Sequence, residues 1–203
     1  GSEPLSALRP RRIGIMGGSF DPVHTGHVAL ATCALQQLDL DEVRWVPVGQ
    51  AWQKSRVLTP AADRIDMVKL AVAHEPRFVV DTVEVDRPGP SYTLDTVRTF
   101  QERAGNESID WYLIVGQDQY RNLTTWHGWQ ELLERVHLAV ACRDSDALPD
   151  LTLGRAFALA MPPISVSSTE IRQHLLAGED PKSLVPTMVS DAVARYIAQH
   201  QLY

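Results

Sequence analysis

The sequence predicts an α/β fold built around a parallel sheet, and three observations carry that prediction. Short apolar runs alternate with longer amphipathic segments along most of the 203 residues, which is the order expected for strand–helix–strand units. The first two apolar runs, residues 13–16 and 42–48, flank a helical pattern, and such a unit favours parallel strands. We see no linker, internal repeat or low-complexity segment, so we expect one domain with a well-buried core.

Runs of β-branched and aromatic residues bounded by turn-forming residues mark the strands. The expected strands are residues 13–16, 42–48, 78–85 (as one strand or two), 111–115, 136–142 and 156–159. Capping residues mark the helices between them. We expect helices to start at Thr25, at Thr59 with Pro60 next, at either Ser91 or Thr93, at the hydroxyl residues 167–169, and at residues 186–189. We also expect a short helix that ends at residues 132–133.

Composition and charge narrow the class of protein. A net charge of −6 argues against a broad basic surface for nucleic acid, whereas a small anion needs only a local basic cluster. No run of about 18 apolar residues is present to span a bilayer. Cys33 and Cys142 fit neither a disulfide framework nor a zinc motif. We therefore expect a cytoplasmic protein with no nucleic-acid or membrane partner, and the sequence leaves a homo-oligomer open.

The first strand and helix enclose the candidate site. The strand runs into Gly17-Gly18-Ser19-Phe20, and His27 falls in the first turn of the helix, with His24 just before it. Glycines let backbone N–H groups approach a ligand closely, and a helix N-terminus offers unpaired donors and about half a positive charge. The pattern therefore predicts a phosphate site, with a bare turn and a solvated cap histidine as the alternative. The glycines do not fit GxGxxG, which disfavours a hydride-transferring enzyme.

Other candidates follow the carboxyl ends of later strands, the edge at which parallel sheets bind ligands. Lys54 and Arg56 either reach a phosphate or are solvated loop charges. Asp118 either accepts hydrogen bonds from sugar hydroxyls or caps a helix. Trp126 either stacks on a heterocycle or covers the core.

A last helix start combines hydroxyl side chains with a cation. Ser167 and Thr169 precede or open this helix, and Arg172 adds a planar fork of donors suited to phosphate. A capping box explains the hydroxyls alone, but it does not explain Arg172.

Residues 17–27, GGSFDPVHTGH, resemble the signature of the nucleotidylyltransferase superfamily. Further stretches resemble bacterial nicotinate mononucleotide adenylyltransferases: PSYT at 90–93, GQD at 116–118, TW at 125–126, CR at 142–143 and SSTEIR at 167–172. The resemblance implies a Rossmann-like, doubly wound parallel sheet of the nucleotidylyltransferase type. It also implies a single domain over residues 1–203, of which we expect residues 1–10 to be an expression remnant and a flexible N-terminus.

The same resemblance implies adenylyl transfer from ATP to nicotinate mononucleotide, giving nicotinate adenine dinucleotide and pyrophosphate in NAD biosynthesis. The residues implied to bind ATP are Gly17, Gly18, Ser19, Phe20, His24, His27, Ser167, Thr169 and Arg172. Those implied to bind the acceptor are Tyr92, Thr93, Asp118, Trp126, His127 and Arg143. The chain departs from the family at Ala51-Trp52-Gln53-Lys54, where Lys54 keeps the basic position but a preceding histidine is replaced.

The implied mechanism is an in-line attack by the acceptor's 5′-phosphate on the α-phosphorus of ATP. That phosphate is largely ionised at neutral pH, so alignment and charge stabilisation suffice. We expect His24, His27, Lys54 and Arg172 to stabilise the leaving pyrophosphate, with Mg²⁺ entering on ATP and no dedicated metal site in the protein. The alternatives are transfer to phosphopantetheine or another phosphate acceptor, a non-catalytic nucleotide sensor, and, least favoured, RNA-related chemistry.

Overall fold

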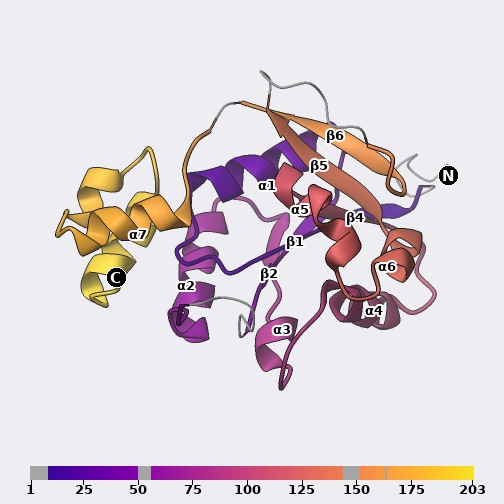
Figure 1. The fold of residues 1–203 in the computed structure, drawn as a ribbon, viewed down its shortest axis with the longest axis horizontal. Helices are drawn as coiled ribbons and strands as arrows, with labels where there is room; N and C mark the ends of the chain where they lie inside the picture. The colour runs from indigo at the N-terminus through magenta and orange to yellow at the C-terminus, as the bar shows by residue number, and fades with distance from the viewer. Residues whose placement is uncertain (1–8, 50–55, 144–150, 163) are drawn as a thin grey trace, which may run out of the picture.

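A six-stranded, all-parallel sheet forms the centre of the computed structural model, which describes residues 9–49, 56–143, 151–162 and 164–203 (Figure 1). The strands are β1 Arg11–Gly18, β2 Glu42–Pro47, β3 Phe78–Val80, β4 Ile109–Val115, β5 His137–Arg143 and β6 Ala156–Met161. Their order in the sheet is β3-β2-β1-β4-β5-β6. The order reverses between β1 and β4, so the predicted doubly wound arrangement is confirmed.

Helices cover both faces of this sheet (Figure 1). They are α1 Thr25–Gln37, α2 Ala61–Val72, α3 Val83–Asp86, α4 Thr93–Ala104, α5 Gln117–Arg121, α6 Trp129–Arg135, α7 Ser168–Leu176 and α8 Asp191–Gln199, with short 3₁₀ turns η2 Leu123–Thr125 and η3 Pro181–Leu184. Among the described helices, none has the length and apolar character needed to cross a membrane.

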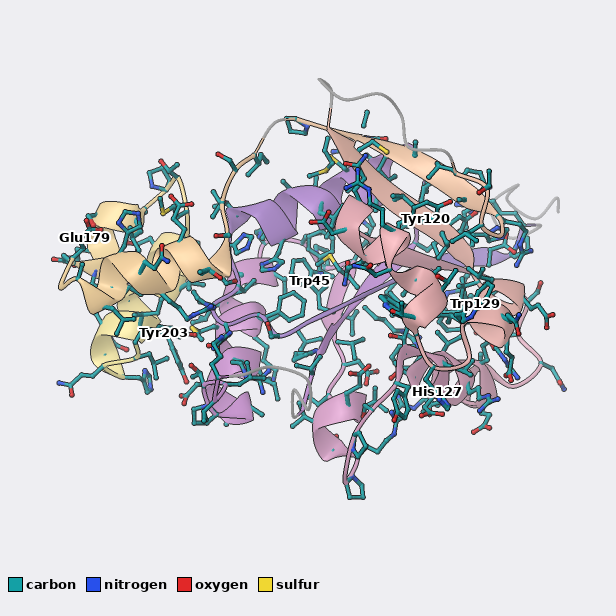
Figure 2. All side chains as sticks on the ribbon, viewed as in Figure 1. Trp45, Tyr120, His127, Trp129, Glu179 and Tyr203 are labelled. Carbon is teal, nitrogen blue, oxygen red and sulfur yellow. The ribbon has the colours of Figure 1, made fainter. Side chains whose placement is uncertain are left out.

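The alternation of side chains along β1 explains the two layers. Ile13 and Ile15 pack in a core with α4, α5 and α6, whereas Met16 packs in a second core with α1, α2, α7 and α8. Trp45 on β2 is fully buried in that second core, and Figure 2 shows it in the middle of the molecule. Because both faces are buried, the strands read as continuous apolar runs.

The register of the sheet sets where a ligand can bind. Ile15 of β1 pairs with Leu113 of β4, so these neighbouring strands end at the same edge. The chain leaves β1 toward α1 on one face, and it leaves β4 toward α5 on the other. A crevice therefore opens at this edge.

Several predicted helix starts were wrong. Thr25 is the first helical residue of α1 and not its cap, because His24 caps the helix while the Thr25 hydroxyl donates to the carbonyl of Thr187 (2.7 Å). Pro60 and Tyr92 occupy the cap positions of α2 and α4, and neither helix has a side-chain cap.

The predictions for two further elements were also wrong. Residues 83–86 form α3 and not a strand, because the Asp81 carboxylate accepts from the N–H of Val83 (3.0 Å) and turns the chain. The last helix begins at Asp191 and not at residues 186–189, because Ser190 Oγ accepts from the N–H of Val193 (3.3 Å) and caps it. The single domain over residues 1–203 stays a prediction, and residues 1–8 of its expected flexible segment lie outside the described residues.

Candidate functional site

A cleft of about 690 Å³ lies at the carboxyl edge of the sheet, at the reversal of strand order. This volume is within the range of small-molecule sites. The first turns of α1 and α5 form two of its walls, and a third is formed by Met161, Pro162, Ile164 and Val166. Its lining brings together residues that were predicted from two separate motifs: His24 and His27 from one, and Asp118 from the other.

The two histidines hold each other in a reciprocal cap at the start of α1. His24 Nδ1 accepts from the N–H of Gly26 (3.0 Å), and His27 Nδ1 accepts from the N–H of His24 (3.0 Å). Their rings stack with centroids 3.7 Å apart, and the edge of Phe20 contacts His27 at a centroid distance of 4.9 Å. Both rings are therefore fixed before any ligand binds.

This arrangement also fixes the protonation of the two rings. A backbone N–H can only donate, so both Nδ1 atoms must be unprotonated and each neutral ring carries its proton on Nε2. Burial lowers the pKa of His24 to about 4. Burial and the neighbouring His24 hold the pKa of His27 well below its ordinary value. The pair thus offers two neutral Nε2–H donors at a helix N-terminus, where an anion is favoured.

Position 26 requires a glycine because the ring of His24 occupies the space that a Cβ would need. An added Cβ at Gly26 would lie 2.9 Å from His24 Cε1 and 3.0 Å from His24 Nδ1, so the ring would have to move. Gly17 is different, since an added Cβ there would make only an ordinary contact at 3.7 Å with the carbonyl oxygen of Val46. The fold does not require glycine at position 17, and the approach of a ligand to the backbone there stays a prediction.

The predicted phosphate loop has a buried anchor. The side chain of Phe20 is 1% exposed and lies in the core, with a positive φ of 48°, so this residue can line the loop only through its backbone. Gly18 lies against its ring, with an added Cβ 3.4 Å from it. Ser19 contributes its carbonyl to a buried guanidinium, that of Arg64, at 3.0 Å.

The start of α7 meets the loop that precedes α1. Ser167 caps α7 by accepting from the N–H of Glu170 (3.1 Å), which is the capping role weighed from the sequence. Arg172 is not a solvated surface charge, because it donates to the carbonyl of Asp21 (2.8 Å) and to Thr169 Oγ1 (3.1 Å). The N-termini of two helices, α1 and α7, therefore adjoin at one side of the cleft.

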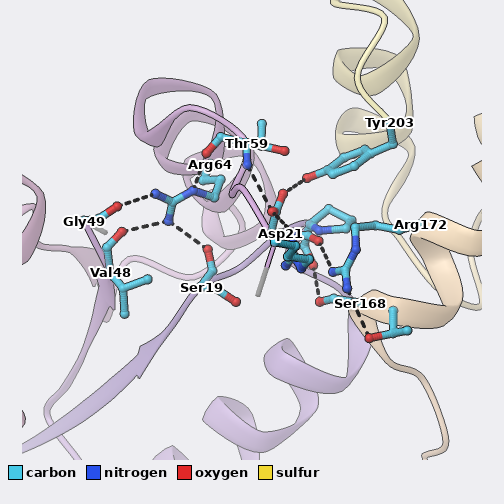
Figure 3. Close-up of polar contacts among 12 residues, drawn as sticks. Ser19, Asp21, Val48, Gly49, Thr59, Arg64, Ser168, Arg172 and Tyr203 are labelled. Carbon is cyan, nitrogen blue, oxygen red and sulfur yellow. Dashed lines mark hydrogen bonds and ion pairs between the residues drawn. The ribbon is translucent and has the colours of Figure 1, made fainter. Parts of the chain in front are cut away.

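Sequence reasoning missed two buried charges beside this loop, Asp21 and Arg64 (Figure 3). Arg64 donates to the carbonyls of Thr59 (2.7 Å), Val48 (2.8 Å), Gly49 (3.0 Å) and Ser19 (3.0 Å). It thereby ties the exits of β1 and β2 together. The one signal in the sequence was an arginine among the apolar residues of the helix over residues 61–72.

Asp118 lies in the first turn of α5 with its side chain 94% exposed. The predicted alternative of a helix-cap aspartate is wrong, since Gly116 is the cap residue and Gln119 Oε1 accepts from its N–H (3.0 Å). Asp118 lines the cleft, and its carboxylate, which lies 3.5 Å from Arg121 Nη1, has further lone pairs that can accept from sugar hydroxyls.

Four of the residues predicted for the acceptor, Tyr92, Thr93, Trp126 and His127, belong to a second region around the start of α4. Tyr92 is 42% exposed and stacks on His127, with ring centroids 4.3 Å apart, and Thr93 is the first residue of α4. Trp126 is half-buried against the core that includes α4 and α6, so one of its weighed roles, covering the core, is confirmed. Figure 2 shows His127 on the α4 side of the molecule.

Two predicted site residues cannot be placed with these groups. Lys54 lies outside the described residues, together with the rest of residues 50–55. Arg143 is the last residue of β5, at the carboxyl edge, and its side chain is outside the description.

Comparisons with known proteins agree with this geometry. The cytidylyltransferase-like family model matches residues 15–174. A protein of Methylibium petroleiphilum named "probable nicotinate-nucleotide adenylyltransferase" is 52% identical, over 98% of this chain and 95% of its own length. A Bordetella pertussis protein of the same name is 40% identical, over 95% of this chain and 98% of its own length.

A solved structure shows the same fold. Nicotinic acid mononucleotide adenylyltransferase of Plasmodium falciparum, complexed with NaAD, superimposes with a TM-score of 0.78 at 21% identity, over 95% of this chain and 97% of that one. Full-length similarity at 40–52% identity to the bacterial proteins shows the family of this chain and not only its fold. The chain belongs to the cytidylyltransferase-like family and, within it, to the nicotinate-nucleotide adenylyltransferases.

Proposed function

We propose that this protein transfers the adenylyl group of ATP to nicotinate mononucleotide, releasing pyrophosphate. The observation that carries the proposal is the reciprocal cap of His24 and His27, which leaves two fixed Nε2–H donors at the cleft. Donors that are fixed in advance, at a helix N-terminus and at the reversal of strand order, suit the charge that develops during phosphoryl transfer.

The state of the histidines supports one kind of mechanism. A neutral ring with its proton on Nε2 and its Nδ1 already bonded has no free lone pair, so neither His24 nor His27 is suited to act as a general base. None is needed, because the acceptor's phosphate has a second pKa near 6 and attacks as an ionised oxygen. A bond forms from this oxygen to the α-phosphorus as the bond from the α-phosphorus to the bridging oxygen of pyrophosphate breaks. The two Nε2–H groups and Arg172 stabilise the charge.

We propose that Mg²⁺ enters as the ATP complex and not at a site built by the protein. The described residues contain no group of three histidine, cysteine or acidic side chains that could hold a metal ion. Mg²⁺ keeps several waters and binds through substrate phosphates in such enzymes, so this donor set fits an ion carried in by ATP. The metal would neutralise phosphate charge, while the residues of the chain align the two nucleotides.

Preference for a nicotinate ring is supported by the group at the start of α4. No side chain caps this helix, so the N–H groups of its first turn, beginning at Thr93, are suited to a carboxylate. The exposed Tyr92 ring and the partly exposed face of Trp126 provide flat surfaces beside them. A nicotinamide would place a neutral amide where these donors favour an anion.

The test is pyrophosphate release with ATP and Mg²⁺, comparing nicotinate mononucleotide, nicotinamide mononucleotide and phosphopantetheine as acceptors. We expect fast release with the first, much slower release with the second and none with the third. Chelation of the metal should abolish release, and added Mg²⁺ should restore it. Equal use of both pyridine nucleotides would remove the carboxylate argument. Binding of ATP without release for any acceptor would favour a nucleotide sensor.

A further inference from the structure

Four segments far apart in the sequence meet at Asp21, a residue with a buried carboxylate (Figure 3). Its Oδ2 accepts from Arg56 Nη1 (2.7 Å) and from the N–H of Thr59 (3.1 Å). Its Oδ1 accepts from the hydroxyl of Tyr203, and its backbone carbonyl accepts from Arg172 Nη1 (2.8 Å). Asp21 is three residues before His24, so this junction adjoins the candidate phosphate site.

The charges at this junction do not balance within the described residues. Three guanidinium groups, those of Arg56, Arg64 and Arg172, gather around Asp21, which is the one fully buried carboxylate in the described part of the chain. Burial alone would raise the pKa of Asp21, but hydrogen bonds from Thr59, Tyr203 and Arg56 outweigh it and keep the pKa low. One negative charge therefore faces three positive ones, which suits a polyanionic ligand.

Counting contacts with described residues only, Arg56 is the cation of this cluster that has unused donors. It uses Nη1 for Asp21, and its other nitrogens donate to no other described residue. Its side chain is 32% exposed and borders a hollow of about 260 Å³ that Gly49 and Thr59 also line. Arg64, by contrast, is buried and uses its donors on backbone carbonyls. Among the described residues, Arg56 thus keeps an unpaired edge, and a buried carboxylate holds its guanidinium in place.

We propose that Arg56 is a further phosphate-binding residue of the ATP site, and that Asp21 and Tyr203 are positioning residues that hold it there. The proposal rests on the proposed function for the identity of the ligand. The anchor works because Asp21 stays ionised while Tyr203 stays a donor. Burial, together with the Asp21 carboxylate, raises the pKa of Tyr203 above its ordinary value. The pair should thus keep its hydrogen bond across the neutral pH range.

The main test compares Arg56→Gln with Arg56→Lys. A lost charge-assisted contact to phosphate should raise the KM for ATP about tenfold in the glutamine variant, and lysine should restore part of it. The KM for nicotinate mononucleotide should not change. A merely structural role would lower the thermal midpoint and affect both substrates alike, and that result would overturn the proposal.

The positioning role has a matched control in a second tyrosine–aspartate contact. Tyr203→Phe removes the hydrogen bond to Asp21, whereas Tyr196→Phe removes a comparable bond to Asp63 Oδ1 (2.7 Å) that joins α8 to α2. We expect Tyr203→Phe to raise the KM for ATP three- to fivefold and Tyr196→Phe to leave it unchanged. Equal effects of the two variants on the KM for ATP would refute the positioning role.

A binding measurement separates this proposal from the proposed function. Inorganic pyrophosphate with Mg²⁺ should raise the thermal midpoint of the wild-type protein, and Arg56→Gln should show a much smaller rise. If that difference is seen while no acceptor supports pyrophosphate release, Arg56 still binds phosphate and only the proposed reaction fails. If the wild type is active but Arg56→Gln retains its pyrophosphate affinity and its KM for ATP, the role of Arg56 is refuted.

Discussion

The two ends of the candidate site are built in different ways. At the phosphate end, His24, His27 and Arg172 are each fixed by hydrogen bonds to the backbone. At the acceptor end, Tyr92 stacks on His127, and the hydrogen-bond donors are main-chain N–H groups at the start of α4. The first end is preorganised for charge stabilisation, whereas the second depends on the local path of the backbone and on an exposed ring.

This difference separates two kinds of kinetic effect. Groups that stabilise the charge of the transition state should act mainly on kcat. Groups that only hold the acceptor should act mainly on its KM. Substitutions at the phosphate end and at the acceptor end should therefore be distinguishable by their kinetics.

The largest effect is expected for His27→Ala at the phosphate end. The change removes an Nε2–H donor and also the Nδ1 acceptor that holds the N–H of His24. Loss of one preorganised donor typically costs about 10²- to 10³-fold in turnover, and we expect kcat to fall by at least that amount. Steady-state kinetics check this, with circular dichroism to show that the fold is retained.

His127→Ala is the control for this change at the acceptor end. It removes the ring that stacks on Tyr92 and should raise the KM for nicotinate mononucleotide with a smaller effect on kcat. Near-normal turnover of His27→Ala would contradict the role of the reciprocal cap.

A smaller effect is expected for Gly128→Ala, which tests the backbone at the acceptor end. Gly128 has a φ of 64°, and an added Cβ would overlap Cδ2 of Leu94 in the first turn of α4. We expect the free energy of unfolding to fall by about 1–3 kcal/mol through strain and overpacking. Displacing this turn should also raise the KM for nicotinate mononucleotide several-fold, without changing the KM for ATP. Denaturant unfolding and initial rates measure the two effects.

Gly105→Ala provides the matched control on the same helix. Gly105 follows the far end of α4 with a φ of 59°, and an added Cβ there would meet no atom within 4 Å. This variant should carry the cost of a positive φ but leave the KM for the acceptor unchanged. If both variants raise that KM equally, the contact between Gly128 and Leu94 does not shape the acceptor site.

The parts of the site that the sequence predicted are those encoded by contiguous residues. The glycine loop, His24 and His27 lie within eleven residues, and Ser167 and Arg172 share one short segment. Their proximity therefore follows from local structure alone. The strand positions were predictable for a similar reason, because buried parallel strands are apolar on both faces.

The junction at Asp21 could not be predicted, because its partners are distant in sequence. Tyr203 is 182 positions away from Asp21, and Arg56 is 35 positions away. Val189 shows the same limit for helices, since it is fully buried but lies before the last helix, which was predicted to include it. An apolar residue indicates burial, but hydrogen bonds of caps such as Ser190 decide where a helix begins.

The smallest effect expected concerns pH and the protonation of His24. Its pKa is about 4 in the folded protein, below the ordinary value of 6.5, so the unfolded chain binds more protons between these values. The stability that depends on neutral His24 is therefore complete above pH 6.5 and is lost as the pH falls toward 4. His24→Asn keeps a capping side chain that does not titrate. We expect its thermal midpoint to fall less than that of the wild type between pH 7 and pH 5, because only the wild type must keep this ring unprotonated. An equal or larger fall would show that protonation of His24 does not limit stability in acid, and the phosphate end would then be less rigidly set than its hydrogen bonds indicate.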